Sequence, residues 1–104
     1  MLVDSHCHLA DPAFTADVGE VVLRARDAGV VHVVVVGESP EAAERALGLV
    51  ERHPGLSATA GLHPHEASRW DRDLESGLRA LLRDPRVVAA GEMGLDYHYD
   101  HSPP

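Results

Sequence analysis

Apolar positions along the chain fall into short continuous runs separated by longer stretches with helical spacing. The run at 30–36 is almost entirely β-branched and is interrupted only by His32. Continuous apolar character of this kind is typical of a parallel strand buried on both faces. Shorter runs at 2–6, 56–62 and 87–90 have the same strand-like character. The pattern therefore predicts four strands.

Between these runs the apolar residues recur every three or four positions, which is typical of amphipathic helices. The first stretch follows Asp17, which forms a capping-box pattern with Glu20. The second begins at Ser39-Pro40, with proline at the first helical position, where its missing N–H costs nothing. The third begins at Asp71 or Asp73. Its expected inward residues are Leu74, Leu78, Leu81 and Leu82.

The expected strands repeat at intervals of about 30 residues, starting near positions 2, 30, 56 and 87. Strand–helix units of this length predict right-handed crossovers and a parallel sheet. The sequence argues against a dinucleotide-binding fold, because the Gly-x-Gly-x-x-Gly motif that marks such a fold does not follow the first strand. The fold class we expect is α/β: a single domain over 1–104 that forms the N-terminal half of a TIM-type (β/α)8 barrel, with about four strands and three helices.

Composition narrows the possible chemistry. Nine basic residues face 17 acidic ones, a net charge of −8, which argues against a bare polyanion-binding surface. All nine are arginine, and the chain contains no lysine. This excludes Schiff-base chemistry, phosphate binding by a P-loop and a carboxylated lysine between two metals. One cysteine, Cys7, rules out an internal disulfide and favours a reducing, cytoplasmic location. We expect no membrane span and no signal peptide.

Polar residues gather where the expected strands end. His6 and His8 are two residues apart at the end of the first strand, so both side chains share a face and form a ready pair of ligands for a divalent metal. The same spacing also occurs in ordinary polar strand ends. Cys7 between them points the other way, toward the helix layer, as a small buried hydrophobe. Asp4 shares the histidine face and is expected to accept a hydrogen bond from an imidazole.

Glu92 follows the fourth apolar strand. A carboxylate there is costly unless it is paired, hydrogen-bonded or bound to a cation. Gly91 and Gly94 on either side permit a positive φ or close backbone approach. With no lysine in the chain, Glu92 is the only local candidate to bridge two metals. Asp96 and Tyr97, just beyond it, either position substrate or shape the loop.

His63 and His65 flank Pro64 at the end of the third strand, where they face either substrate or solvent. We expect His63 to face substrate. The remaining histidines have no partner at ligand spacing and are expected to be structural or exposed: His32, His53, His98 and His101.

Three segments together resemble the TatD family of metal-dependent hydrolases: Val-Asp-Ser-His-Cys-His-Leu-Ala-Asp at 3–11, Gly-Leu-His-Pro-His at 61–65 and Gly-Glu-Met-Gly-Leu-Asp-Tyr at 91–97. The resemblance implies a barrel of the metallo-dependent hydrolase superfamily that hydrolyses phosphodiester bonds, typically in DNA, with two divalent ions such as Mg²⁺, Mn²⁺ or Zn²⁺. It implies that His6 and His8 hold one metal, Glu92 bridges both, and His63 faces the phosphate. Glu92 and His63 are then the catalytic residues, with Asp96 and Tyr97 on the substrate.

The resemblance also has a gap. The family carries further ligands, two histidines and an aspartate, on later strands, and this sequence ends before them. We therefore expect this chain to be the N-terminal half of a TatD-type nuclease, truncated after its fourth strand. Whether this half is active on its own stays open. Two alternatives remain: another metallo-hydrolase acting on amides or esters, and a non-catalytic half-barrel that binds metal or associates with itself or a complementary half. Two unpaired sheet edges favour such association.

Overall fold

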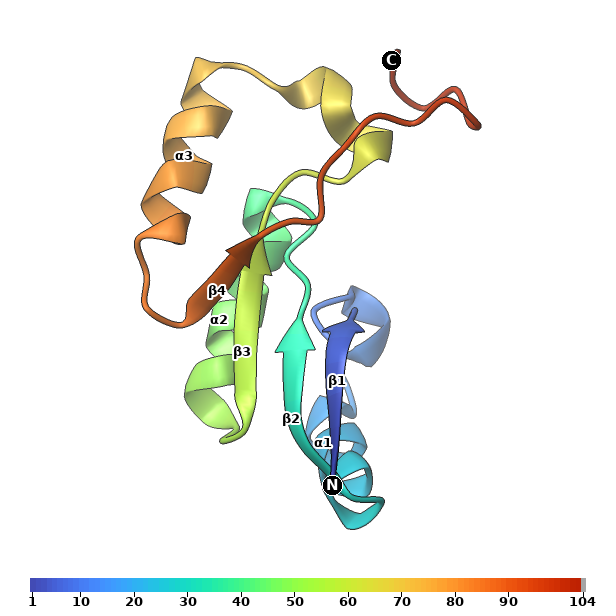
Figure 1. The fold of residues 1–104 in the computed structure, drawn as a ribbon, viewed down its shortest axis with the longest axis vertical. Coiled ribbons are helices and arrows are strands. Elements are labelled where there is room, and N and C mark those ends of the chain that lie inside the picture. Colours follow the sequence, from blue (N-terminus) through green and yellow to red (C-terminus); the bar gives the residue numbers. More distant parts are fainter. Residues whose placement is uncertain (104) are drawn as a thin grey trace.

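A computed structural model describes residues 1–103 and shows a single parallel sheet in the order β1-β2-β3-β4 (Figure 1). This confirms the expected α/β class with four strands and three α-helices. The expected strand starts at 2, 30, 56 and 87 coincide with the observed ones. The elements in chain order are β1 (Leu2–Cys7), the 3₁₀ helix η1 (Pro12–Phe14), α1 (Val18–Asp27), β2 (Val30–Val35), α2 (Pro40–Arg52), β3 (Leu56–Ala60), the 3₁₀ helix η2 (Pro64–Arg69), α3 (Arg72–Leu82) and β4 (Val87–Ala90).

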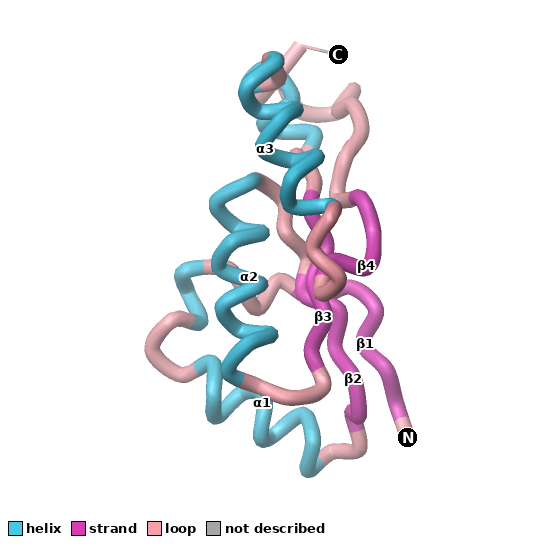
Figure 2. Tube along the Cα trace, turned by 90° about the vertical axis from the view of Figure 1, so that its left-hand side faces the viewer, coloured by secondary structure: helices cyan, strands magenta, loops and turns pink. Residues whose placement is uncertain are grey.

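All three α-helices cover one face of the sheet, as the edge-on view shows (Figure 2). The core lies between these layers, and β3 is buried along its whole length. In β2, Val33 and Val35 are buried against the helices, but His32 and Val34 on the other face are only partly buried. The expectation that β2 is buried on both faces is therefore wrong for this chain, because no second layer covers that face among residues 1–103.

Side-chain caps start two of the three α-helices. The Ser39 hydroxyl accepts a hydrogen bond from the Ala42 amide, and the Asp71 carboxylate accepts one from the Leu74 amide, at 3.1 and 2.7 Å. Asp17 precedes α1 as expected, but its side chain makes no capping hydrogen bond. Of the leucines expected to point inward from α3, Leu78 is buried, whereas Leu82 at the helix end is exposed.

The outer strands β1 and β4 are largely exposed. Leu2, Val3 and Val88 each leave more than half of their surface open to solvent. Parallel edge strands with exposed apolar side chains are the positions at which further strands pair. Within the described residues, no helix is long and apolar enough to cross a membrane.

Candidate metal centre

The candidate site lies at the carboxyl ends of the four strands, where the following loops converge (Figure 1). Each strand contributes a polar side chain: His6 near the end of β1 and the others from the residues that follow β2, β3 and β4, which are Glu38, His63 and Glu92. In a parallel β/α sheet these ends meet at the same edge, which is where β/α barrels place their chemistry. His8, one residue after β1, joins them.

His6, His8 and Glu92 come together as the sequence predicts. Glu92 Oε2 lies 3.4 Å from His6 Nε2 and 3.9 Å from His8 Nε2, and the two Nε2 atoms are 3.2 Å apart. One ligand atom from each residue falls within 4.8 Å of the others. Two imidazole nitrogens and a carboxylate oxygen suit Zn²⁺ or Mn²⁺, and all three side chains are partly exposed, which leaves an open side for water or substrate. The donor set fits a divalent cation.

The second carboxylate oxygen of Glu92 faces a different residue. Glu92 Oε1 lies 3.5 Å from His63 Nε2, so the carboxylate stands between the histidine pair of β1 and the histidine that follows β3. Its backbone is held by close packing, because a Cβ added at Gly61 would lie 2.6 Å from the Glu92 carbonyl oxygen. Gly91 and Gly94 both have positive φ, which confirms the conformation expected of them.

The ring of His63 has a defined protonation pattern. Its Nδ1 accepts a hydrogen bond from the backbone N–H of His65 at 3.0 Å, so the ring proton is on Nε2, facing Glu92. A nitrogen that carries a proton cannot bind a metal. Glu38, His63 and Glu92 also place ligand atoms within 4.8 Å of one another, but His63 in this form donates a hydrogen bond rather than a lone pair. This second group therefore lacks one of its three ligands.

Glu38 was missed by the sequence reasoning. Its Oε2 lies 3.7 Å from His8 Nδ1, on the side of the ring away from His6 and Glu92. A carboxylate at that nitrogen favours the tautomer with the proton on Nδ1 and leaves Nε2 free as a ligand. The signal was present, since Glu38 follows a strand end in the same way as the other site residues.

Asp4 does not take the role expected of it. Its Oδ1 accepts a hydrogen bond from the backbone N–H of His6 at 3.1 Å rather than from a ring nitrogen, because β1 is irregular between Asp4 and Cys7. Cys7 packs against the core as expected. Burial, followed by the nearby Asp4 charge, raises the pKa of the Cys7 thiol, which disfavours the thiolate that a metal would bind.

Asp96 and Tyr97 lie beside the site in the loop after β4. Asp96 Oδ1 accepts hydrogen bonds from the His98 and Tyr99 amides at 2.8 and 3.1 Å, and these bonds lower the pKa of the carboxyl. Its Oδ2 lies 3.0 Å from His65 Nε2, although the two are not aligned as a hydrogen bond. Tyr97 is 80% exposed. Asp96 thus orders the loop, and Tyr97 projects from it.

Three of the remaining histidines, His32, His98 and His101, divide into two kinds. His32 Nε2 lies 2.9 Å from the Ser57 hydroxyl on the open face of the sheet, which fits the structural role expected of it. His98 and His101 are exposed, as expected, but each also packs against the ring of Tyr99. Sequence spacing between histidines could not reveal these contacts, because the shared partner is a tyrosine.

A parallel β/α sheet with imidazole and carboxylate groups at the carboxyl ends of its strands defines part of a TIM-type barrel with a candidate metal centre. A family model described as TatD related DNase matches residues 3–104, and the chain belongs to this family. The resemblance seen in the three sequence segments is thereby confirmed.

Individual relatives agree with this assignment. The chain is 42% identical over 103 residues to the 3'-5' ssDNA/RNA exonuclease TatD of Enterobacter lignolyticus and 40% identical over 104 residues to that of Edwardsiella piscicida, covering 99% of this chain and 40% of each relative. The crystal structure of YJJV, a TatD homologue from Escherichia coli K12, superposes with a TM-score of 0.85 at 36% identity, covering 95% of this chain and 39% of that one. The chain thus spans about 40% of the length of the curated relatives it matches.

Proposed function

We propose that the chain is the N-terminal part of a divalent-metal-dependent hydrolase that cleaves phosphodiester bonds in DNA or RNA. The observation that carries the proposal is the convergence of His6, His8 and Glu92, with ligand atoms within 4.8 Å, at the strand ends of a TatD-family sheet. The names of the matched relatives, single-strand exonucleases, support this substrate class. The free Cys7 thiol and a nucleic-acid substrate favour a cytoplasmic location.

In this proposal His6, His8 and Glu92 hold the cation. A bound divalent cation supplies Lewis acidity, which lowers the pKa of water toward neutrality and offsets charge on the phosphate. Glu92 presents Oε2 to the histidine pair and Oε1 to the Nε2–H of His63. A second ion shared at Glu92, as the family resemblance implies, would need the further ligands that the family carries on later strands. Nitrogen and oxygen donors together accommodate Mg²⁺, Mn²⁺ or Zn²⁺.

His63 contributes a proton donor. Its Nε2–H is directed into the site by the hydrogen bond at Nδ1, so it can donate to a phosphate oxygen placed near Glu92. A donor held in advance toward developing negative charge is the arrangement that lowers an activation barrier most effectively. In the loop after β4, the Asp96 carboxylate accepts a hydrogen bond from the backbone N–H of His98, and the exposed Tyr97 would contact substrate.

The test is cleavage of an end-labelled single-stranded oligonucleotide with and without Mn²⁺. Two proteins are compared: the 104-residue chain and a version extended with the remaining strands that its relatives carry. We expect strong metal-dependent cleavage by the extended version only, because the family's later ligands lie on those strands. Equal cleavage by both proteins would show that these ligands are dispensable. Failure of Glu92→Gln to reduce cleavage by the extended version would overturn the proposal.

We further propose that the open face and edges of the sheet are covered by complementary strands, which complete the barrel. The exposed apolar side chains of the edge strands, such as Leu2, Val3 and Val88, support this. The 104-residue chain alone should therefore self-associate. Multi-angle light scattering should report species larger than a monomer, and a monomer that melts cooperatively would contradict the proposal.

A further inference from the structure

The loop after β4 and the neighbouring η2 together carry a cluster of partly or fully exposed rings beside the candidate metal centre. This ring cluster consists of His65, His98, Tyr99 and His101. We propose that it is a stacking surface for unpaired bases of a single-stranded nucleic acid whose phosphate lies at His63. The inference rests on the proposed function and adds the residues that would recognise the strand.

The rings form a continuous row that starts at the candidate site. The centroid of His65 lies 4.4 Å from that of His63, 5.5 Å from Tyr99 and 4.4 Å from His101. His98 extends the row, 4.5 Å from Tyr99. Aromatic rings typically pack with centroids about 4.5–7 Å apart, and these four distances lie within or at the lower edge of that range. A strand with one phosphate at His63 would thus meet rings at its neighbouring nucleotides.

Hydrogen bonds hold this row in place before any ligand arrives. Asp96 accepts from the amides of His98 and Tyr99, and the Ser102 hydroxyl donates to the His65 carbonyl at 2.7 Å. Ser102 also accepts from the Ser68 amide at 3.2 Å and is 2% exposed, so it fastens the loop to η2. A surface ordered in advance loses less entropy on binding. The loop is therefore built to present its rings.

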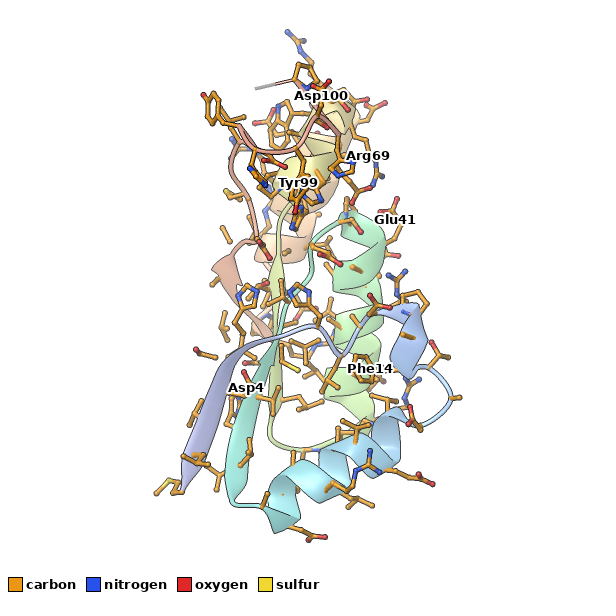
Figure 3. All side chains as sticks on the ribbon, turned by 90° about the vertical axis from the view of Figure 1, so that its right-hand side faces the viewer. Asp4, Phe14, Glu41, Arg69, Tyr99 and Asp100 are labelled. Carbon is orange, nitrogen blue, oxygen red and sulfur yellow. The ribbon has the colours of Figure 1, made fainter. Side chains whose placement is uncertain are left out.

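The rings are open to solvent on the side away from these bonds. Tyr99 is 57% exposed and the His65 side chain is 41% exposed, and Figure 3 shows Tyr99 in the loop at the end of the molecule that lies beyond the strands. Bases of any sequence stack on such rings, because every base has a π-face. Bases inside a duplex are already stacked on one another, so the surface selects an unpaired strand.

The charges around the ring cluster point to base stacking, rather than to phosphate contacts, as the source of affinity. The nearby Arg69 guanidinium lies 2.8 Å from Glu41 (Figure 3) and 3.0 Å from Glu66, so its charge is already paired. Asp96 and Asp100 add negative charge to the same loop. Stacking, rather than Arg–phosphate contacts, must then supply the affinity, and the salt dependence should be shallow. A metal is not the occupant that the cluster suits, because neither candidate ligand group within residues 1–103 includes a member of it.

The proposal is tested by fluorescence anisotropy with the extended protein in EDTA, which removes cation-mediated binding and cleavage. The probes are a labelled thymidine hexamer, an abasic strand of the same length and a blunt duplex. We expect the hexamer to bind about 5- to 150-fold more tightly than the abasic strand, the range for stacking of one base. Tyr99→Leu should lose most of this difference and Tyr99→Phe should keep it, with circular dichroism verifying the fold. His98→Leu is a second variant expected to weaken the preference.

Equal binding of hexamer and abasic strand, retention of the preference in Tyr99→Leu, or no binding of any probe would each overturn the inference. The result is separable from the cleavage test. If the extended protein cleaves but the abasic strand binds equally well, the stacking surface is wrong and the proposed function stands. If cleavage fails while the preference for the hexamer persists, the proposed function is wrong and the surface stands.

Discussion

The backbone N–H of His65 donates a hydrogen bond to Nδ1 of His63 at 3.0 Å, and this bond determines what His63 can do. The ring keeps its proton on Nε2, 3.5 Å from Glu92 Oε1. A histidine that binds a metal through Nε2 needs its other nitrogen to donate, commonly to a carboxylate or carbonyl. His63 has the opposite arrangement, because its Nδ1 already faces a donor. It is therefore suited to donate to substrate, whereas His6 and His8 are the proposed ligands of the cation.

Removing His63 should separate catalysis from metal binding. In the extended protein, His63→Ala should slow cleavage by about 10²–10³-fold, the usual effect of losing one donor to developing charge. Its Mn²⁺ affinity should stay near that of the unaltered protein. His6→Ala, by contrast, should abolish tight binding. Isothermal titration calorimetry with Mn²⁺ compares the two, and equal loss of affinity in both variants would make His63 a ligand.

Glu38 should affect the centre through His8. The carboxylate faces His8 Nδ1 at 3.7 Å, so Glu38→Ala removes the group that favours a free Nε2. Loss of such a partner typically lowers metal affinity by about 10–100-fold. Asp4→Ala is the matched control, because that carboxylate contacts a backbone amide instead, and its effect should be clearly smaller. If Asp4→Ala weakened Mn²⁺ binding more than Glu38→Ala did, the assignment of Glu38 would be wrong.

Much of the fold followed from local pattern. A β-branched run such as 30–36 has few alternatives to a strand, and Ser39 before Pro40 is a strong helix start. His6 and His8 were identifiable because their spacing and position at a strand end both point to one face. Glu38 was not predicted as a site residue, because it directly precedes the helix start at Ser39-Pro40 and this obscured its position after the end of β2.

Contacts between distant segments could not be predicted in this way. His65 and Asp96 are 31 positions apart, and their pairing depends on how η2 and the loop after β4 meet. The 3₁₀ helix η2 was not predicted from the sequence, since short 3₁₀ segments leave little periodicity. Burial of β2 on both faces was expected because the run is apolar, but within residues 1–103 no second layer covers its other face.

The order of the loop after β4, which carries three of the four rings of the cluster, should depend on the charge of Asp96. Hydrogen bonds from the His98 and Tyr99 amides lower the pKa of Asp96 from the ordinary value of 3.8. The stabilisation that these bonds give the loop is therefore complete above pH 3.8. It is lost as the pH falls below 3.8 and through the lowered pKa. In ¹⁵N NMR spectra the two amide resonances should titrate with a midpoint below 3.8. Asp96→Asn should abolish this titration, and a midpoint above 3.8 would contradict the bonding described.

Gly61 should be required for the position of Glu92. An alanine Cβ there would lie 2.6 Å from the Glu92 carbonyl oxygen and from the Gly91 carbonyl carbon, so the loop after β4 must shift. We expect Gly61→Ala to cost about 1–3 kcal/mol of stability, as overpacking does, and to weaken Mn²⁺ binding because Glu92 moves away from His6. Gly48→Ala in α2 is the control, since its Cβ would meet no atom within 4 Å and should stabilise the helix by about 0.5–1 kcal/mol. Thermal melts and calorimetry measure both effects. Unchanged Mn²⁺ affinity in Gly61→Ala would show that the backbone of Glu92 tolerates displacement and that the glycine serves packing alone.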